Sequence, residues 1–262
     1  MPVRKRFGQH FLHDPQVIRR IIDSVAPVEG QRIVEVGPGR GALTWGLLER
    51  AKRLDVIEID RDLAHLLEAD PRAKNGLHVH VENVLDTDFV RLRGSSEPLR
   101  VVGNLPYNIS TPLLFRLLNQ RSAISDMYFM LQKEVVDRMA AQPGTKDYGR
   151  LTVMLAAFAE VQGMFDVGPG AFQPRPKVWS AIVRLRPTHG PRFDIGREGV
   201  LRTVVTAAFS HRRKTLRNSL KGLLAAQDIE SCGIDPQLRP ETLAPAQFGL
   251  LAAHYSRLVG YT

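Results

Sequence analysis

The chain has 262 residues, of which 44% are hydrophobic, so it can bury the core of one large domain and of one small domain. Its 36 Lys and Arg residues outnumber its 27 Asp and Glu residues, and the formal net charge of +9 favours a polyanionic partner such as nucleic acid. The single cysteine, Cys232, excludes disulfides, cysteine-rich zinc sites and redox pairs within one chain.

The sequence also indicates where the protein is located and whether it binds a metal. The longest apolar stretch, LTVMLAAFAEV at 151–161, is far shorter than a bilayer span. The N-terminus has basic residues but no apolar signal core and no long amphipathic presequence, so we expect a cytoplasmic protein without membrane association. The eight histidines show no ligand spacing with acidic or cysteine partners, so no metal site is predicted. We expect a monomer.

Residues 31–131 alternate short β-branched runs with amphipathic segments, the pattern of a parallel sheet covered by helices. Strands are expected at 32–36, 54–59, 77–81, 99–103 and 127–131, and helices at 43–51, 63–69 and 112–119. Ser110 or Thr111 should cap the last of these helices, with Pro112 in its first turn. The apolar runs 163–167 and 178–185 flank a proline-rich segment and should form a hairpin that closes the sheet.

After residue 187 the strand signals stop. Helices are expected at 200–210, 216–226 and 245–258, divided by Gly233, Pro236 and Pro240. The prediction is therefore an α/β fold: a Rossmann-like domain at 1–188 followed by a small α-helical domain at 189–262.

A strand runs into a glycine-rich turn and then a helix at 33–42, IVEVGPGRGA. Glycines there let the backbone approach a ligand, and the helix N-terminus offers N–H groups to a negatively charged group. The spacing Gly37-x-Gly39-x-x-Ala42 also fits the dinucleotide fingerprint, so a nicotinamide cofactor stays possible, as do glycines that serve only loop packing.

Polar residues end the next two strands. Glu58 follows Gly37 by about 20 residues, where an acidic side chain can accept hydrogen bonds from both hydroxyls of a ribose. Asp60 could instead serve as a helix cap, and Asn83 could pair with the edge of an adenine ring. The carboxyl ends of parallel strands lie side by side, where ligands bind in such folds.

The fourth strand ends in GNLPYNIS at 103–110, which taken alone is more typical of a turn than of a catalytic site. The exocyclic amine of adenine is a poor nucleophile because its lone pair is delocalised into the ring. Hydrogen bonds from both N–H groups, one to the Asn104 side chain and one to a backbone carbonyl of Leu105-Pro106, would return that lone pair to the nitrogen. Tyr107 offers a face on which the base can stack, a contact worth about 1–3 kcal/mol. Catalysis would then consist of positioning and electrostatics.

Five motifs occur together in one order. They are RFGQHFL (6–12), EVGPG (35–39), VIEID (56–60), GNLPYNIS (103–110) and FxPxPKVxS (172–180), followed by FSHRRK at 209–214. In this set, and over nearly its whole length, the chain resembles the KsgA/RsmA family of ribosomal RNA adenine N6,N6-dimethyltransferases. The resemblance implies a class I methyltransferase sheet and S-adenosylmethionine as methyl donor. The implied substrate is two adjacent adenines near the 3′ end of small-subunit (16S) rRNA, in the immature small ribosomal subunit.

By position, the resemblance implies a cofactor site made of His10, Leu12, Gly37, Gly39, Glu58, Asn83 and Asn104. His10 and Leu12 would close over the cofactor. Gly37 would approach its methionine part, and Glu58 would hold its ribose. Family members often have Asp at the position of Asn83, and Asn accepts from the adenine amine without charge assistance, so weaker cofactor binding is expected. Asp86 is the alternative partner of the adenine.

The resemblance further implies that Asn104, Pro106, Tyr107 and Phe172 act on the target base. Phe172 would be the second aromatic wall, although an ordinary core phenylalanine is an equally good interpretation. RNA phosphates would be bound by the basic cluster Arg212, Arg213, Lys214, Arg217 and Lys221, for which a solvated helix face is the weaker alternative.

Three other functions are compatible with parts of the sequence. An Erm-type methyltransferase would keep the fold and the donor but act on a large-subunit rRNA adenine. A ribosome-assembly or transcription factor would keep the fold without catalysis, although intact Glu58, Asn104, Pro106 and Tyr107 argue against it. A nicotinamide dehydrogenase would explain neither GNLPY nor the positive charge.

Overall fold

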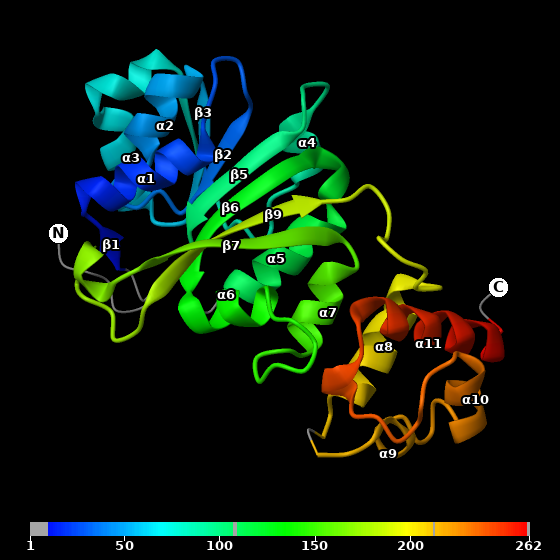
Figure 1. Ribbon diagram of the computed structural model, residues 1–262. Helices are drawn as coiled ribbons and strands as arrows, with labels where there is room; N and C mark the ends of the chain where they lie inside the picture. Colours follow the sequence, from blue (N-terminus) through cyan, green and yellow to red (C-terminus); the bar gives the residue numbers. More distant parts are fainter. Residues whose placement is uncertain (1–9, 107–108, 212, 261–262) are drawn as a thin grey trace. The chain divides into compact units, whose positions relative to one another are not determined.

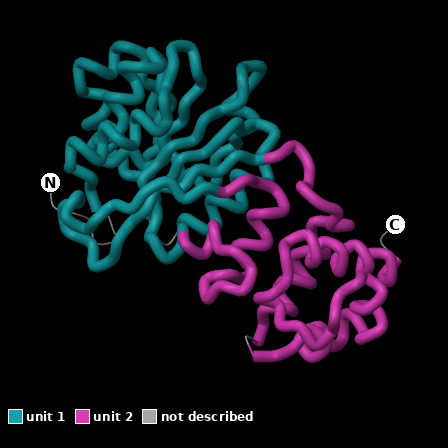
Figure 2. The backbone as a smooth tube through the Cα atoms, viewed as in Figure 1, with its two compact units in different colours: residues 1–136, 162–187 teal, residues 137–161, 188–262 magenta. Residues whose placement is uncertain are grey.

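The structure, a computed structural model, describes residues 10–106, 109–211 and 213–260. The chain divides into two compact units (Figure 2): unit 1 comprises 1–136 and 162–187, and unit 2 comprises 137–161 and 188–262. The chain passes between the units three times, and the last of these boundaries, at 187/188, lies one residue from the boundary expected at 188/189. Residues 137–161, which the sequence analysis placed in the first domain, group with the C-terminal helices because α7 (Arg150–Ala156) packs on α8 (Glu198–Ala208) and α11 (Pro245–Leu258).

Unit 1 is built on a mainly parallel sheet, as the sequence predicts. Among the described residues its strand order is β4-β3-β2-β5-β6-β9-β7. The strands are β2 (Ile33–Val36), β3 (Leu54–Glu58), β4 (Leu77–Val81), β5 (Leu99–Asn104), β6 (Ile124–Gln132), β7 (Ala159–Val167) and β9 (Ser180–Pro187). The first five are parallel, and β9 runs antiparallel to β6. The predicted hairpin is confirmed, because β7 and β9 are neighbours at one edge of the sheet.

Helices cover this sheet (Figure 1). They are α1 (Pro15–Val25), α2 (Thr44–Ala51), α3 (Arg61–Ala69), α4 (Phe89–Arg93), α5 (Ser110–Asn119) and α6 (Lys133–Met139). Ile22 of α1 and Leu47 of α2 share a buried cluster with Val102 of β5 and Met130 of β6. The predicted cap of α5 is wrong: Ser110 is already the first helical residue, and Ile109 precedes it without a side-chain cap bond.

The N-terminal part of unit 1 forms a short strap that the sequence analysis did not predict. Strand β1 (Phe11–Leu12) pairs antiparallel with β8 (Phe172–Gln173), and Leu12 lies opposite Phe172. Asp14 then caps α1 by accepting from the backbone N–H groups of Gln16 and Val17. The strap therefore joins segments that lie about 160 residues apart, as the register of Leu12 with Phe172 shows.

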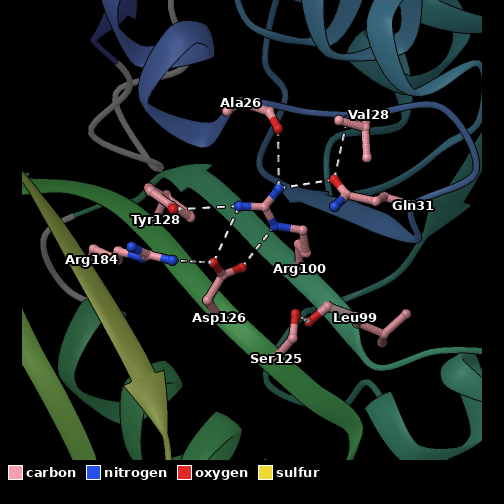
Figure 3. A network of polar contacts seen from close by, with 9 residues as sticks. All are labelled: Ala26, Val28, Gln31, Leu99, Arg100, Ser125, Asp126, Tyr128 and Arg184. Carbon is pink, nitrogen blue, oxygen red and sulfur yellow. Dashed lines mark hydrogen bonds and ion pairs between the residues drawn. The ribbon is translucent and has the colours of Figure 1, made fainter.

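A charged network joins three adjacent strands of unit 1 (Figure 3). The carboxylate of Asp126 on β6 accepts from Arg100 Nε on β5 at 2.9 Å and from Arg184 Nη2 on β9 at 3.1 Å. Both guanidinium groups lie over the ring of Tyr128, 5.5 and 5.3 Å from its centroid. The side chain of Gln31, which precedes β2, accepts from Arg100 Nη1 at 2.9 Å. The network therefore helps to hold the middle of the sheet together.

Unit 2 is helical apart from the first residues of β7, and contains α7, α8, α9 (Leu216–Ser219), α10 (Ala226–Ser231) and α11. The Phe209 ring stacks on Phe248 with centroids 5.4 Å apart, and Tyr148 meets the Phe209 ring edge-on. The single helix predicted over 216–226 is wrong: α9 ends at Ser219, and Gly222, with φ +99°, lies in the left-handed region that ends regular helix. No helix of the described chain is long and apolar enough to cross a membrane.

Candidate active site

Unit 1 contains a cavity of about 370 Å³ at the carboxyl ends of β2, β3, β4 and β5, large enough for a nucleoside-sized ligand. Every described residue of the predicted cofactor and catalytic sets lines it: His10, Leu12, Gly37, Gly39, Glu58, Asn83, Asn104, Pro106 and Phe172. Tyr107 lies outside the described residues. The polar strand ends that the sequence placed side by side therefore face one cavity.

The glycine loop after β2 needs glycine for two different reasons. Gly37 and Gly39 have φ values of +64° and +57°, a conformation that side chains with a Cβ disfavour. A Cβ on Gly39 would also lie 3.2 Å from the ring of Phe11, which belongs to the strap. The guanidinium of Arg40 lies over the same ring, 4.5 Å from its centroid. The loop and the strap are thus packed together at the cavity wall.

Glu58 ends β3 and is only 5% exposed. Its Oε2 accepts from the N–H of Gly39 at 3.2 Å, and its Oε1 accepts from the N–H of Asp60 at 2.9 Å. Burial raises the pKa of Glu58, and these backbone hydrogen bonds oppose the rise. Each oxygen has a further lone pair, so the carboxylate can still accept from two ligand hydroxyls. Asp60 itself caps α3 through the N–H of Asp62, as its alternative interpretation predicts.

Glu35 is a second acidic residue on the cavity wall, and the sequence analysis missed it as a site residue. It lies in the middle of β2, and its Oε2 accepts from Thr44 Oγ1 at 2.6 Å. Burial, with a smaller contribution from the nearby Glu58, raises the pKa of Glu35 to about 7, although the Thr44 hydrogen bond lowers it. The one available signal was an acidic residue inside an otherwise apolar strand.

Asn83, beyond β4, is held in its own loop by two hydrogen bonds. Its Oδ1 accepts from the N–H of Leu85 at 3.1 Å, and its Nδ2 donates to Asp86 Oδ2 at 3.0 Å. Asn83 lines the cavity, whereas Asp86 does not. Asp86 therefore contacts the predicted adenine-binding side chain rather than replacing it.

Asn104 is the last residue of β5 and is partly buried. The residue before it must be small, because a Cβ on Gly103 would lie 2.7 Å from the carbonyl oxygen of Val36. The Nδ2 group of Asn104 donates to the carbonyl of His10 at 3.2 Å. Within the described chain, the Oδ1 of Asn104 takes part in no hydrogen bond, so it remains available as an acceptor.

Of the two backbone carbonyls considered beside Asn104, that of Pro106 already accepts from the N–H of Ile109 at 3.2 Å. The Leu105 carbonyl accepts from no residue that the structure describes, while the Leu105 N–H is bonded to Met130. Phe172 is 3% exposed and belongs to the buried cluster of unit 1, which agrees with its interpretation as a core residue. It nevertheless also lines the cavity.

The basic cluster of unit 2 is exposed where it is described. Arg213, Lys214, Arg217 and Lys221 are exposed, and the side chains of Leu216 and Leu220 between them are buried; Arg212 lies outside the described residues. Because α9 ends at Ser219, Arg217 and Lys221 do not lie on one continuous helix.

Comparisons with known proteins identify relatives over nearly the whole chain. The model of the ribosomal RNA adenine dimethylase family matches residues 2–255. The ribosomal RNA small subunit methyltransferase A of Pseudomonas aeruginosa is 54% identical over 257 residues, which cover 98% of this chain and 96% of the relative. The protein of the same name from Hahella chejuensis is 51% identical over 95% of this chain and 91% of its own length.

Two solved structures share the fold. A dimethyladenosine transferase from Plasmodium falciparum superimposes with a TM-score of 0.78 at 26% identity, covering 92% of this chain and 96% of the other. The 23S rRNA methyltransferase ErmE superimposes with a TM-score of 0.73, also at 26% identity, covering 94% and 99%. The predicted class I methyltransferase sheet is thereby confirmed.

Proposed function

The chain belongs to the ribosomal RNA adenine dimethylase family, and we propose that it transfers methyl groups to N6 of two adjacent adenines in the 3′-terminal hairpin of small-subunit rRNA. The reaction gives dimethyladenosines during ribosome biogenesis. The observation that carries the proposal is the position of Asn104, whose side-chain oxygen is available at the edge of the cavity that contains Glu58 and the glycine loop.

The residues of the cavity fit S-adenosylmethionine. Gly37 and Gly39 bring the backbone close to the cavity, where a Cβ on Gly39 would crowd the strap. Glu58 has lone pairs for the two ribose hydroxyls. Asn83 lines the same cavity, which supports its proposed contact with the edge of the adenine. When bound, the cofactor supplies an electrophilic methyl group.

The chain's own residues activate the target amine. The amine donates one N–H to Asn104 Oδ1 and the other to the Leu105 carbonyl, and the lone pair returns to the nitrogen. The nitrogen would take the methyl group as the bond between that carbon and the sulfonium sulfur breaks, which would leave a neutral thioether. The resulting ammonium would lose a proton to water, so no strong general base is required. The imide geometry of Pro106 stiffens the turn and contributes no N–H of its own.

The partner that we propose is the immature small ribosomal subunit, with the protein acting as a monomer in the cytoplasm. The names of the curated relatives support the small subunit over the large one. The similarity to ErmE keeps an adenine of large-subunit rRNA as the second candidate.

The test incubates the purified protein with labelled S-adenosylmethionine and immature small or large ribosomal subunits, and maps the modified bases by primer extension and mass spectrometry. We expect dimethylation of two adjacent adenines in small-subunit rRNA. Label only in large-subunit rRNA would favour the Erm-type function. RNA binding without any label would favour a non-catalytic assembly factor.

A further inference from the structure

Trp179 is an unusually exposed aromatic residue in unit 1. The residue is 55% exposed, and the neighbouring Val178 is 41% exposed. Tryptophan normally buries most of its large apolar surface, so an exposed one beside a binding site marks a candidate contact. Nothing in the mechanism proposed above uses this side chain.

The register of the sheet places Trp179 at the same edge as the cavity. Asn104 on β5 pairs with Met130 on β6, and Met130 pairs with Ile182 on β9. Because β9 is antiparallel to β6, the three residues from Ile182 back to Trp179 lead toward the carboxyl edge of the parallel strands. In an ideal flat sheet, with strands about 4.8 Å apart and a rise of about 3.3 Å per residue, these positions correspond to a separation of about 14 Å between the Cα atoms of Trp179 and Asn104.

The segment that carries Trp179 is held in place at both ends. The carbonyl of Trp179 accepts from the N–H of Lys133 at 2.9 Å, and the carbonyl of Pro174 accepts from His10 Nδ1 at 2.7 Å. Pro174 and Pro176 also restrict the backbone between these points. The ring lies against Gly168, where a Cβ would be 3.7 Å away. A segment whose backbone is restrained in this way loses little backbone entropy when a partner stacks on its ring.

The charge of the same segment selects the kind of partner. Arg175 and Lys177 are exposed and form no ion pair with any described residue. An aromatic face beside such cations is the combination that binds single-stranded nucleic acid, because bases stack on the ring and phosphates pair with the cations. A protein partner would require a wider apolar surface than this segment offers.

We infer that Trp179, Arg175 and Lys177 form a platform that binds an unpaired nucleotide of the RNA beside the target adenine. The inference rests on the proposed function, because it assigns part of the substrate to this edge of unit 1. The ring stacks on the base of that nucleotide, and the two cations contact its neighbouring phosphates.

The first experiment measures methylation of immature small subunits by Trp179→Ala and Trp179→Phe variants. In Trp179→Ala, loss of stacking should raise KM by about 5- to 150-fold, while kcat stays within about twofold of the parent value. Trp179→Phe keeps an aromatic ring, so its KM should lie close to that of the parent protein. Val178→Ala, at the exposed neighbour, is the matched control and should leave KM unchanged.

The second experiment uses the fact that the chain contains only two tryptophans, Trp45 and Trp179. In Trp45→Phe, binding of the 3′-terminal rRNA hairpin should quench the remaining fluorescence, whereas Trp179→Phe, which retains Trp45, should show no quenching. Arg175→Gln with Lys177→Gln should make RNA affinity less dependent on salt, by the equivalent of about one to two phosphates.

The inference of an RNA-binding platform is contradicted if Trp179→Ala keeps the KM of the parent protein, or if binding of the hairpin leaves Trp179 fluorescence unchanged. In either case methylation by the parent protein would still support the proposed function. A parent protein that labels no small-subunit rRNA would overturn both proposals. An unchanged affinity for RNA with a weaker affinity for ribosomal proteins would show instead that Trp179 contacts protein.

Discussion

The side-chain amide of Asn104 donates to the backbone carbonyl of His10, 3.2 Å away, and so joins the tip of β5 to the N-terminal strap. Because Nδ2 is used in this contact and Oδ1 accepts from no residue that the structure describes, Oδ1 can accept from a ligand. The strap is itself fixed by pairing with β8 and by the His10 to Pro174 hydrogen bond. The geometry of the acceptor therefore depends on segments that are distant in sequence.

Replacing Asn104 with Ala should remove the acceptor, together with the hydrogen bond from Nδ2 to the His10 carbonyl. We expect kcat to fall by at least about 10²-fold, with little change in cofactor affinity. A loss of this size is typical of other enzymes from which a group that stabilises the transition state has been deleted. Single-turnover methylation and calorimetric titration with S-adenosylmethionine measure the two quantities. An equal loss of both would show that Asn104 is structural.

Replacing Asp86 with Ala should weaken cofactor binding although Asp86 does not line the cavity. The variant loses the hydrogen bond that fixes the Asn83 amide, worth about 1 kcal/mol, so the Kd for S-adenosylmethionine should rise about fivefold. Asn83→Asp combined with Asp86→Ala should restore affinity, because a carboxylate accepts from the adenine amine in either orientation. Calorimetric titration with S-adenosylmethionine measures the Kd of both variants. An unchanged Kd in Asp86→Ala would mean that the Leu85 hydrogen bond alone is enough to orient the Asn83 amide.

Glu35 should make stability depend on pH. Its pKa is raised to about 7 from 4.5, so the folded state holds a proton that the unfolded state loses between these values. The unfolded state then binds fewer protons, and the free energy of unfolding falls as the pH rises from about 4.5 through 7. Glu35→Gln, which keeps the shape without the charge, should have a flatter profile over this range. Thermal melts at pH 5 and pH 8 compare the two proteins, and parallel profiles would contradict the prediction.

The basic cluster of unit 2 should supply non-specific affinity for RNA. Arg213→Glu with Arg217→Glu should weaken binding of the rRNA hairpin and reduce its salt slope by about one for each phosphate that the variant no longer neutralises. Fluorescence anisotropy between low and moderate salt measures the slope. An unchanged salt slope would show that these residues form a solvated surface and do not contact RNA phosphates.

Sequence patterns predicted the sheet well because its central strands β2, β3, β5 and β6 are mostly buried and apolar, and helical segments separate the parallel strands. They also predicted that Glu58, Asn83 and Asn104 face one cavity, since the carboxyl ends of parallel strands meet at one edge. The strap could not be predicted, because two-residue strands have no period and pair across about 160 residues, as Leu12 and Phe172 do. The grouping of residues 137–161 with unit 2 depends on tertiary packing, which local sequence propensities do not reveal.

Asp126 should be a large contributor to the stability of unit 1, unlike an ion pair at the surface. Its side chain is 9% exposed and neutralises two guanidinium groups, those of Arg100 and Arg184. Asp126→Asn leaves both cations without a counterion among the described residues and should lower the free energy of unfolding by about 3 kcal/mol. Asp23 provides the matched control, because its side chain is 54% exposed and pairs with Arg50 at the surface. Asp23→Asn should lower the free energy of unfolding by less than about 1 kcal/mol. Urea unfolding of both variants measures the difference. Equal small losses would mean that water solvates Arg100 and Arg184 once the carboxylate is removed, and that the three strands are held by their backbone pairing alone.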